Sequence, residues 1–131
     1  GAEWLRSHFC EYGYTLRYPS DKTDITRIEY EGWHYRYVGR AHAMIMKYLD
    51  LCLEEYIEYL KSYTADGKYL TLLDDGDVSY MYAGNTLKCA YAVYYVPASG
   101  GESTEILIPK DTEYDISGNN TDGFVVVLKR K

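Results

Sequence analysis

The pattern of hydrophobic and polar positions is clearest between residues 41 and 60, where apolar residues recur every three or four positions. That period is typical of an amphipathic helix. The pattern predicts one long helix, or two in sequence with a break near Asp50 and Leu51. Its apolar stripe is expected in the core and comprises Ala41, Met44, Ile45, Tyr48, Leu49, Cys52, Leu53, Tyr56, Ile57 and Leu60.

Shorter elements are predicted ahead of this helix. Residues 3–12 carry apolar side chains at helical spacing and are followed by Gly13, so we expect an N-terminal helix that ends there. Residues 14–18 and 28–38 are typical of strands, and turn-forming residues at 20–24 lie between them. A strand, a turn and a strand of this size predict a β-hairpin.

The second half of the chain changes to short strand-like runs. Residues 64–68 form a predicted joint, and the runs 69–73, 78–82, 87–96, 105–108 and 124–128 follow, separated by turn residues that include the stretch 117–123. We therefore expect an α+β protein. Residues 1–64 would hold the helices and the hairpin, and residues 65–131 a small all-β module.

Composition narrows the class of protein. A net charge of −6 argues against a nucleic-acid partner, which needs a basic face to neutralise phosphates. No apolar run approaches the about 20 residues that cross a bilayer, so no transmembrane segment is expected. The three cysteines, Cys10, Cys52 and Cys89, have no CxxC spacing and are expected as small buried hydrophobic residues.

Tyrosine is abundant, with 17 in 131 residues. Because tyrosine buries a large ring and keeps a polar tip, it suits strand faces, interfaces and sugar-like ligands equally. The tyrosines of the second half either form a stacking surface for glycan or peptide or fill a half-buried sheet face. They are residues 69, 80, 82, 91, 94, 95 and 114.

The stretch EYEGWHYRYVG at 29–39 concentrates polar chemistry in a predicted strand. In a regular strand Glu31 and His34 point to opposite faces, so they meet only if the backbone bends, which Gly32 would permit. A converged pair could use the imidazole as a zinc ligand and the carboxylate as the base that takes a proton from water. The alternative is a core histidine beside a solvated glutamate.

The motifs GxxxRYP at 13–19, ExWHYRYVG at 31–39 and LEEY at 53–56 occur in this order. In combination they resemble the C-terminal part of the VanY-type D-alanyl-D-alanine carboxypeptidases, over about residues 3–60. The resemblance implies a zinc D,D- or L,D-carboxypeptidase that trims peptidoglycan stem peptides. It also implies an extracytoplasmic place in the bacterial cell envelope.

The resemblance assigns roles to individual residues. It implies that His34 is the third zinc ligand and Glu31 the catalytic base. It suggests substrate contacts for Arg17, Arg36 and Trp33, with a structural ion pair as the alternative for either arginine. The family usually has proline where this chain has Gly32, a change expected to loosen the approach to the site.

One part of the family pattern is absent. The family's first two zinc ligands belong to a Ser-x-His-x-x-Gly-x-Ala-x-Asp motif, and none of the 131 residues match it. A catalytic zinc normally has three protein ligands. His8 and His42 have no partner at metal-ligand spacing, and solvated or capping roles are the default for them. We therefore expect an inactive fragment of a zinc enzyme that holds no zinc stably by itself.

Two further expectations follow. If the chain is not catalytic, it is a cell-wall-binding or protein-interaction module. If part of a domain is missing, an apolar patch remains beside the hairpin at 14–38, and this predicts a homodimer through that face.

Overall fold

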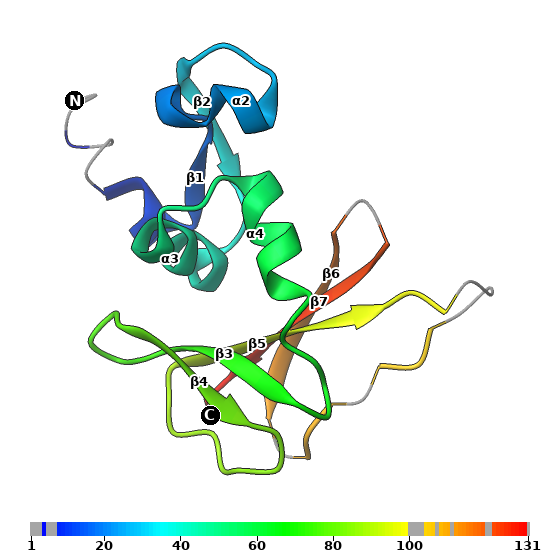
Figure 1. The fold of residues 1–131 in the computed structure, drawn as a ribbon. Coiled ribbons are helices and arrows are strands. Elements are labelled where there is room, and N and C mark those ends of the chain that lie inside the picture. Colours follow the sequence, from blue (N-terminus) through cyan, green and yellow to red (C-terminus); the bar gives the residue numbers. More distant parts are fainter. Residues whose placement is uncertain are drawn as a thin grey trace. The chain divides into compact units, whose positions relative to one another are not determined.

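The computed structural model describes Trp4 and residues 8–99, 104–106, 108–110, 112–119 and 122–130. The chain forms two compact units, residues 1–58 and 59–131, here called the N-terminal and C-terminal units. The predicted α+β class is confirmed, because helices accompany a hairpin and a separate antiparallel sheet (Figure 1). The division into a peptidase part at 1–64 and an accessory module at 65–131 stays a prediction.

The N-terminal unit contains the predicted hairpin. Strands β1 (Tyr14–Tyr18) and β2 (Glu31–Tyr37) pair antiparallel, although β2 begins three residues later than expected. The predicted turn between them contains a 3₁₀ helix, η2 (Ser20–Lys22), and a single helical turn, α2 (Thr23–Thr26).

The N-terminal helix predicted over residues 3–12 is confirmed only in part. Its residues 3 and 5–7 lie outside the described residues, and its end forms a 3₁₀ helix, η1 (Phe9–Tyr12). Gly13 ends this segment as predicted, with φ of 88° and its amide donating to the Cys10 carbonyl. A Cβ at Gly13 would lie 2.7 Å from a ring carbon of Tyr37, so only glycine fits this left-handed, crowded position.

The predicted amphipathic segment is two helices, α3 (Arg40–Leu49) and α4 (Leu53–Leu60). The break lies at Asp50, whose φ of 55° is left-handed, and the amide of Leu51 donates to the Met46 carbonyl across the helix end. Much of the stripe is buried as expected, but Tyr48 is exposed. The buried residues of these helices include Ala41, Ala43, Ile45, Met46, Tyr56 and Leu60.

The C-terminal unit is a five-stranded antiparallel sheet in the order β4-β3-β5-β7-β6. Its strands are β3 (Lys68–Leu72), β4 (Val78–Tyr82), β5 (Tyr91–Pro97), β6 (Glu113–Gly118) and β7 (Gly123–Lys129). Two predictions were wrong. The described residues of the run 105–108 are in no strand, and β6 includes residues that were assigned to a turn.

Burial follows position in the sheet. Strands β3, β5 and β7 each have four consecutive buried residues, whereas the edge strand β6 is exposed along its length. The tyrosines divide into a buried and an exposed group, and a ligand-stacking role of the exposed ones stays a prediction. Tyr69, Tyr94 and Tyr95 are buried, and the Tyr69 and Tyr94 rings stack at 4.5 Å, while Tyr80, Tyr82 and Tyr114 are exposed.

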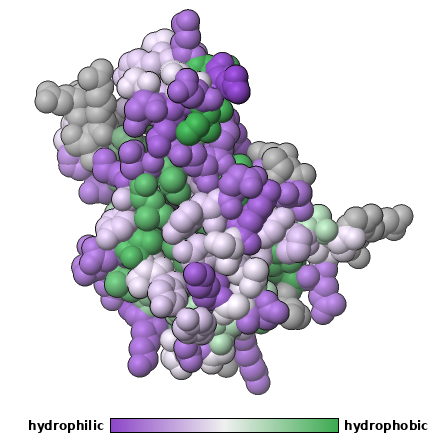
Figure 2. Space-filling model, in the orientation of Figure 1, coloured by the Kyte–Doolittle hydropathy of each residue, from purple (hydrophilic) through white to green (hydrophobic). Residues whose placement is uncertain are grey.

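The three cysteines are free and buried, which confirms the prediction made for them. Hydrophilic residues cover most of the face in Figure 2, and hydrophobic residues gather in limited patches. Among the described residues no helix has the length and apolar character needed to span a bilayer.

A buried asparagine holds the turn between β6 and β7. The Asn119 side chain is 5% exposed, and its Oδ1 accepts from the backbone amides of Asp122 and Gly123 at 3.0 and 3.1 Å. Its Nδ2 donates to Asp122 Oδ1 at 3.0 Å, and that oxygen also accepts from the Tyr95 hydroxyl. Lys61 forms an ion pair with the other oxygen of Asp122 at 2.8 Å.

We predict that Asn119→Ala lowers the free energy of unfolding by about 1–3 kcal/mol, because it removes the side chain that pairs two backbone amides and the Asp122 carboxylate in this turn. Urea denaturation followed by circular dichroism measures this change. Ser117→Ala, on the exposed strand β6, is the control and should change stability by less than about 0.5 kcal/mol. Equal stability of the two variants would contradict the role given to Asn119.

Candidate functional site

The hairpin departs from regular pairing at the predicted site. Leu16 pairs with Tyr35, and Tyr18 pairs with Glu31. An advance of two residues along β1 is therefore matched by four residues along β2. Two additional residues are therefore accommodated on β2 opposite Arg17. Such a bulge bends the strand and changes where its side chains point. Gly32 lies within it, where the sequence predicted a bend.

The bulge brings Glu31 and His34 together. His34 Nδ1 lies 3.1 Å from Glu31 Oε1, and their side chains are 46% and 31% exposed. The pair is thus on the surface, and the alternative of a core histidine beside a solvated glutamate does not hold. In the tautomer that donates from Nδ1 to this carboxylate, Nε2 keeps a lone pair.

Tyr18 borders this pair and was not singled out from the sequence. Its ring meets the His34 imidazole edge to face, with centroids 5.1 Å apart, and the Arg17 guanidinium lies 4.6 Å from the Tyr18 ring centroid. The sequence signal that could have identified Tyr18 was its position in the motif Arg17-Tyr18-Pro19, directly after the arginine. Tyr18 therefore restricts the orientation of the imidazole from β1.

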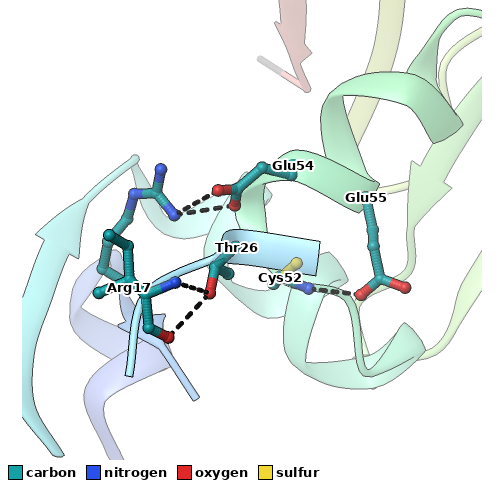
Figure 3. Close-up of polar contacts among 6 residues, drawn as sticks. Arg17, Thr26, Cys52, Glu54 and Glu55 are labelled. Carbon is teal, nitrogen blue, oxygen red and sulfur yellow. Dashed lines mark hydrogen bonds and ion pairs between the residues drawn. The ribbon is translucent and has the colours of Figure 1, made fainter. Parts of the chain in front are cut away.

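Arg17 pairs with the first turn of α4 (Figure 3). Its Nη1 donates to Oε1 and Oε2 of Glu54 at 2.8 and 3.1 Å, and its side chain is 17% exposed. Glu54 belongs to the LEEY motif, so two of the motifs that carry the family resemblance meet in this ion pair. Arg17 thus forms the structural ion pair that was the alternative to a substrate contact. Its contact with substrate stays a prediction.

The neighbouring glutamate caps the same helix. Glu55 Oε1 accepts from the backbone amide of Cys52 at 3.1 Å and pairs with Lys22 Nζ at 3.0 Å (Figure 3 shows the contact with Cys52). This is the contact that a glutamate at the third helical position makes in a capping box. Burial acts to raise the pKa of Glu55, but Lys22 and the Cys52 amide outweigh it and lower that pKa below its usual value.

The remaining predicted site residues lie on β2 without described polar partners. The Trp33 side chain is 75% exposed, and Arg36, opposite Thr15, is also exposed. No ion pair or side-chain hydrogen bond of Arg36 is present in the described part of the chain. Both side chains are therefore accessible to a ligand, and their substrate contacts stay predictions.

The other two histidines do not complete a metal site. His8 Nδ1 lies 2.8 Å from the Trp4 carbonyl oxygen, and its ring stacks on the Trp4 indole. His42 Nδ1 lies 2.6 Å from the Tyr56 hydroxyl, whose pKa is raised by burial. Across the described residues, no three His, Cys, Asp or Glu side chains form a group that could hold a metal ion. Among the described residues, His34 would supply one of the three protein ligands of a catalytic zinc site.

Comparison with known proteins extends these observations. The family described as "VanY: D-alanyl-D-alanine carboxypeptidase" matches residues 1–40. A D-alanyl-D-alanine carboxypeptidase of Enterococcus faecium is 38% identical over 126 residues, which are 96% of this chain and 36% of that protein. The crystal structure of the vancomycin-resistance D,D-dipeptidase VanXYg, in complex with a D-Ala-D-Ala phosphinate analog, matches with 41% identity and a TM-score of 0.80.

Residues 1–40 thus match the VanY family, and nearly the whole chain is similar to the two D-Ala-D-Ala peptidases just named. The match to VanXYg covers 98% of this chain and 46% of that one. A bifunctional D-Ala-D-Ala dipeptidase and carboxypeptidase of Enterococcus gallinarum, VanXYC, is 46% identical over 59 residues, 45% of this chain and 31% of that protein. The chain thus spans less than half the length of these VanY relatives. The likeness to two of them extends well beyond residues 3–60, so the C-terminal unit also has counterparts in VanY proteins.

We predict that Glu55→Gln lowers the free energy of unfolding by about 1 kcal/mol at pH 7, because it removes an ion pair and weakens a helix cap. Since the folded-state pKa of Glu55 is below its ordinary value of 4.5, its contribution is present above that value. It is lost as the pH falls through the folded-state pKa. Urea denaturation should show that the difference in free energy of unfolding between Glu55→Gln and the parent chain is smaller below pH 4 than at pH 7.

The control for this experiment is Glu29→Gln, which changes an exposed carboxylate with no described ion pair. It should change stability little at either pH. A Glu55→Gln deficit that is the same at both pH values would show that the carboxylate charge does not stabilise the helix start.

Proposed function

We propose that this chain is the C-terminal portion of a zinc-dependent D-alanyl-D-alanine carboxypeptidase that acts on peptidoglycan stem peptides. The observation that carries the proposal is the convergence of Glu31 and His34 at a bulge, within the segment that matches the VanY family. The activity belongs to the whole protein. The 131-residue chain alone is inactive, because it lacks two of the metal ligands.

Each residue of the pair has its own role in this proposal. His34 would hold zinc through its imidazole, and Tyr18 limits the rotation of the ring. When bound, zinc supplies a Lewis acid for peptide hydrolysis. Glu31 is the general base that takes a proton from the attacking water. Its partial exposure suits this role, because water reaches its carboxylate directly.

Substrate binding falls to the exposed side chains of β2. Arg36 would pair with the terminal carboxylate of the stem peptide, and Trp33 would cover part of the peptide. Arg17 would contribute less to substrate binding, because its guanidinium already donates to Glu54. The proposed substrate is a D-Ala-D-Ala terminus, in keeping with the names of the relatives and with the analog bound to VanXYg.

The site of action follows from this substrate. Peptidoglycan stems are extracytoplasmic, so we place the protein in the bacterial cell envelope. Residues 1–64 contribute to the catalytic domain, and residues 65–131 form the accessory module. A homodimer through other exposed aromatic side chains of the hairpin, including Tyr14 and Tyr37, is part of the same proposal.

A second candidate is a non-catalytic module that binds cell-wall material or a partner protein. It is favoured by one observation, the lack of a three-ligand group among the described residues. The two candidates differ in what Glu31 does. A base is essential to a peptidase and dispensable in a binding module.

We predict that the 131-residue chain binds less than stoichiometric zinc and does not cleave a peptide ending in D-Ala-D-Ala. In the full-length gene product, Glu31→Gln should keep zinc and lower kcat/KM by about 10²-fold to 10⁴-fold, the usual contribution of a general base. His34→Ala should lose zinc and activity together. Metal analysis by mass spectrometry and release of D-alanine measure both effects.

Glu29→Gln is the matched control, since it changes a carboxylate two positions from Glu31 and should leave zinc content and kcat/KM unchanged. Chelator-sensitive cleavage by the 131-residue chain would refute the fragment proposal. Full activity of the Glu31→Gln protein would refute Glu31 as the general base. No release of D-alanine by the parent full-length protein would support the binding module instead.

A further inference from the structure

His34 lies in the part of the hairpin where the backbone pairing is interrupted. The register of β1 and β2 gives it no partner residue on β1. Its side chain is 46% exposed, and Glu31 is the polar partner that the described part of the chain gives it. Under the proposed function Glu31 acts on water. The orientation of the imidazole therefore needs a second support.

Tyr18 supplies that support from the opposite strand. Its ring and the His34 imidazole meet edge to face, with an interplanar angle of 77° and centroids 5.1 Å apart. Aromatic pairs prefer this arrangement, because the positive edge of one ring faces the negative face of the other. Tyr18 is only half-buried, so packing alone leaves its ring room to turn. The ring can restrict the imidazole only if it is itself held in place.

Arg17 and Glu54 hold the Tyr18 ring. The guanidinium lies 4.6 Å from the centroid of that ring, within range of a cation–π contact. Arginine is a flexible side chain, and here both oxygens of Glu54 fix it by accepting from Nη1 at 2.8 and 3.1 Å (Figure 3). Since the Arg17 side chain is 17% exposed, water competes little for this pair. A continuous series of contacts thus runs from α4 through β1 to the imidazole.

We propose that Glu54 is a positioning residue for His34 and that it acts through Arg17 and Tyr18. Without Glu54 the guanidinium can leave the Tyr18 ring, the ring can turn, and the imidazole loses its fixed orientation. All four residues belong to the N-terminal unit. The inference rests on the proposed function for its consequence at zinc, whereas the contacts themselves do not depend on that function.

The alternative is that the Arg17–Glu54 pair only attaches α4 to the hairpin. Lys22 and Glu55 form a second ion pair between the connection of the hairpin and the same helix, at 3.0 Å. The two pairs are similarly buried, with side chains 17% and 33% exposed in the first and 16% and 26% exposed in the second. No contact of the second pair with either ring is present in the described structure. Glu55→Gln is therefore the matched control, because it weakens the attachment of α4 and leaves the rings in place.

The first test is NMR of the metal-free 131-residue chain, in which the side chains of the two rings are observed directly. In the parent we expect nuclear Overhauser contacts between the ring protons of Tyr18 and those of the His34 imidazole, because the rings are in contact. Glu54→Gln should lose these contacts, and Glu55→Gln should keep them at the intensity of the parent. Unchanged contacts in Glu54→Gln would overturn the proposal and leave the ion pair a structural role.

The second test measures the zinc affinity of the full-length protein by competition with a chelator. Tyr18→Leu should bind zinc about tenfold more weakly, the lower end of the range for residues that orient a metal ligand. Glu54→Gln should weaken binding in the same direction, whereas Glu55→Gln should lower the Tm and leave zinc affinity unchanged. In the Tyr18→Leu protein, Glu54→Gln should have no further effect, since its route to His34 is gone. A further loss there would show that Glu54 does not act through Tyr18.

The two tests separate this inference from the proposed function. If the parent full-length protein holds no zinc, the proposed function fails, and the NMR comparison still decides whether Glu54 orients the imidazole. If the parent holds zinc and Glu54→Gln binds it as tightly, the positioning role fails and the zinc peptidase stands.

Discussion

Opposite Arg17 the hairpin accommodates two additional residues on β2, and the candidate site depends on that irregularity. Strand geometry alone sends residues 31 and 34 to opposite faces. The bulge cancels that alternation, so a carboxylate and an imidazole three positions apart come within hydrogen-bond distance. The same irregularity leaves Trp33 strongly exposed, because no partner residue of β1 lies opposite it.

The hairpin is joined to α4 by charge. Consecutive glutamates at the start of that helix serve different segments, with Glu54 bound to Arg17 of β1 and Glu55 bound to Lys22 of η2. Both acids also lie where the positive end of the helix dipole favours them. The LEEY motif is therefore explained by its contacts, since it ties the strand that carries Tyr18 to the helix that follows the site.

The sequence predicted the elements with strong periodicity or clear turn residues. The break near Asp50, the end of the first helical segment at Gly13 and the strand at 78–82 were all recognised. Strand β6 was missed because it is short and ends in residues typical of a turn, although Tyr114 and Ile116 alternate with polar residues. Both of these side chains are exposed, so the pairing with β7 is the feature that defines the strand. The contact between Glu31 and His34 was predicted only conditionally, since a glycine permits a bulge without requiring one. The Arg17–Glu54 pair has no local signal, because it depends on residues brought together by the fold.

The two outer strands of the five-stranded sheet differ in how they face other molecules. Strand β6 carries Glu113 and Asp115, and charges of this kind discourage the addition of a foreign strand. Strand β4, with the sequence VSYMY, has no charged residue. Charged side chains therefore disfavour the addition of a strand at the β6 edge, and β4 has no such side chain. An added strand would therefore meet charged side chains at β6 and none along Val78–Tyr82.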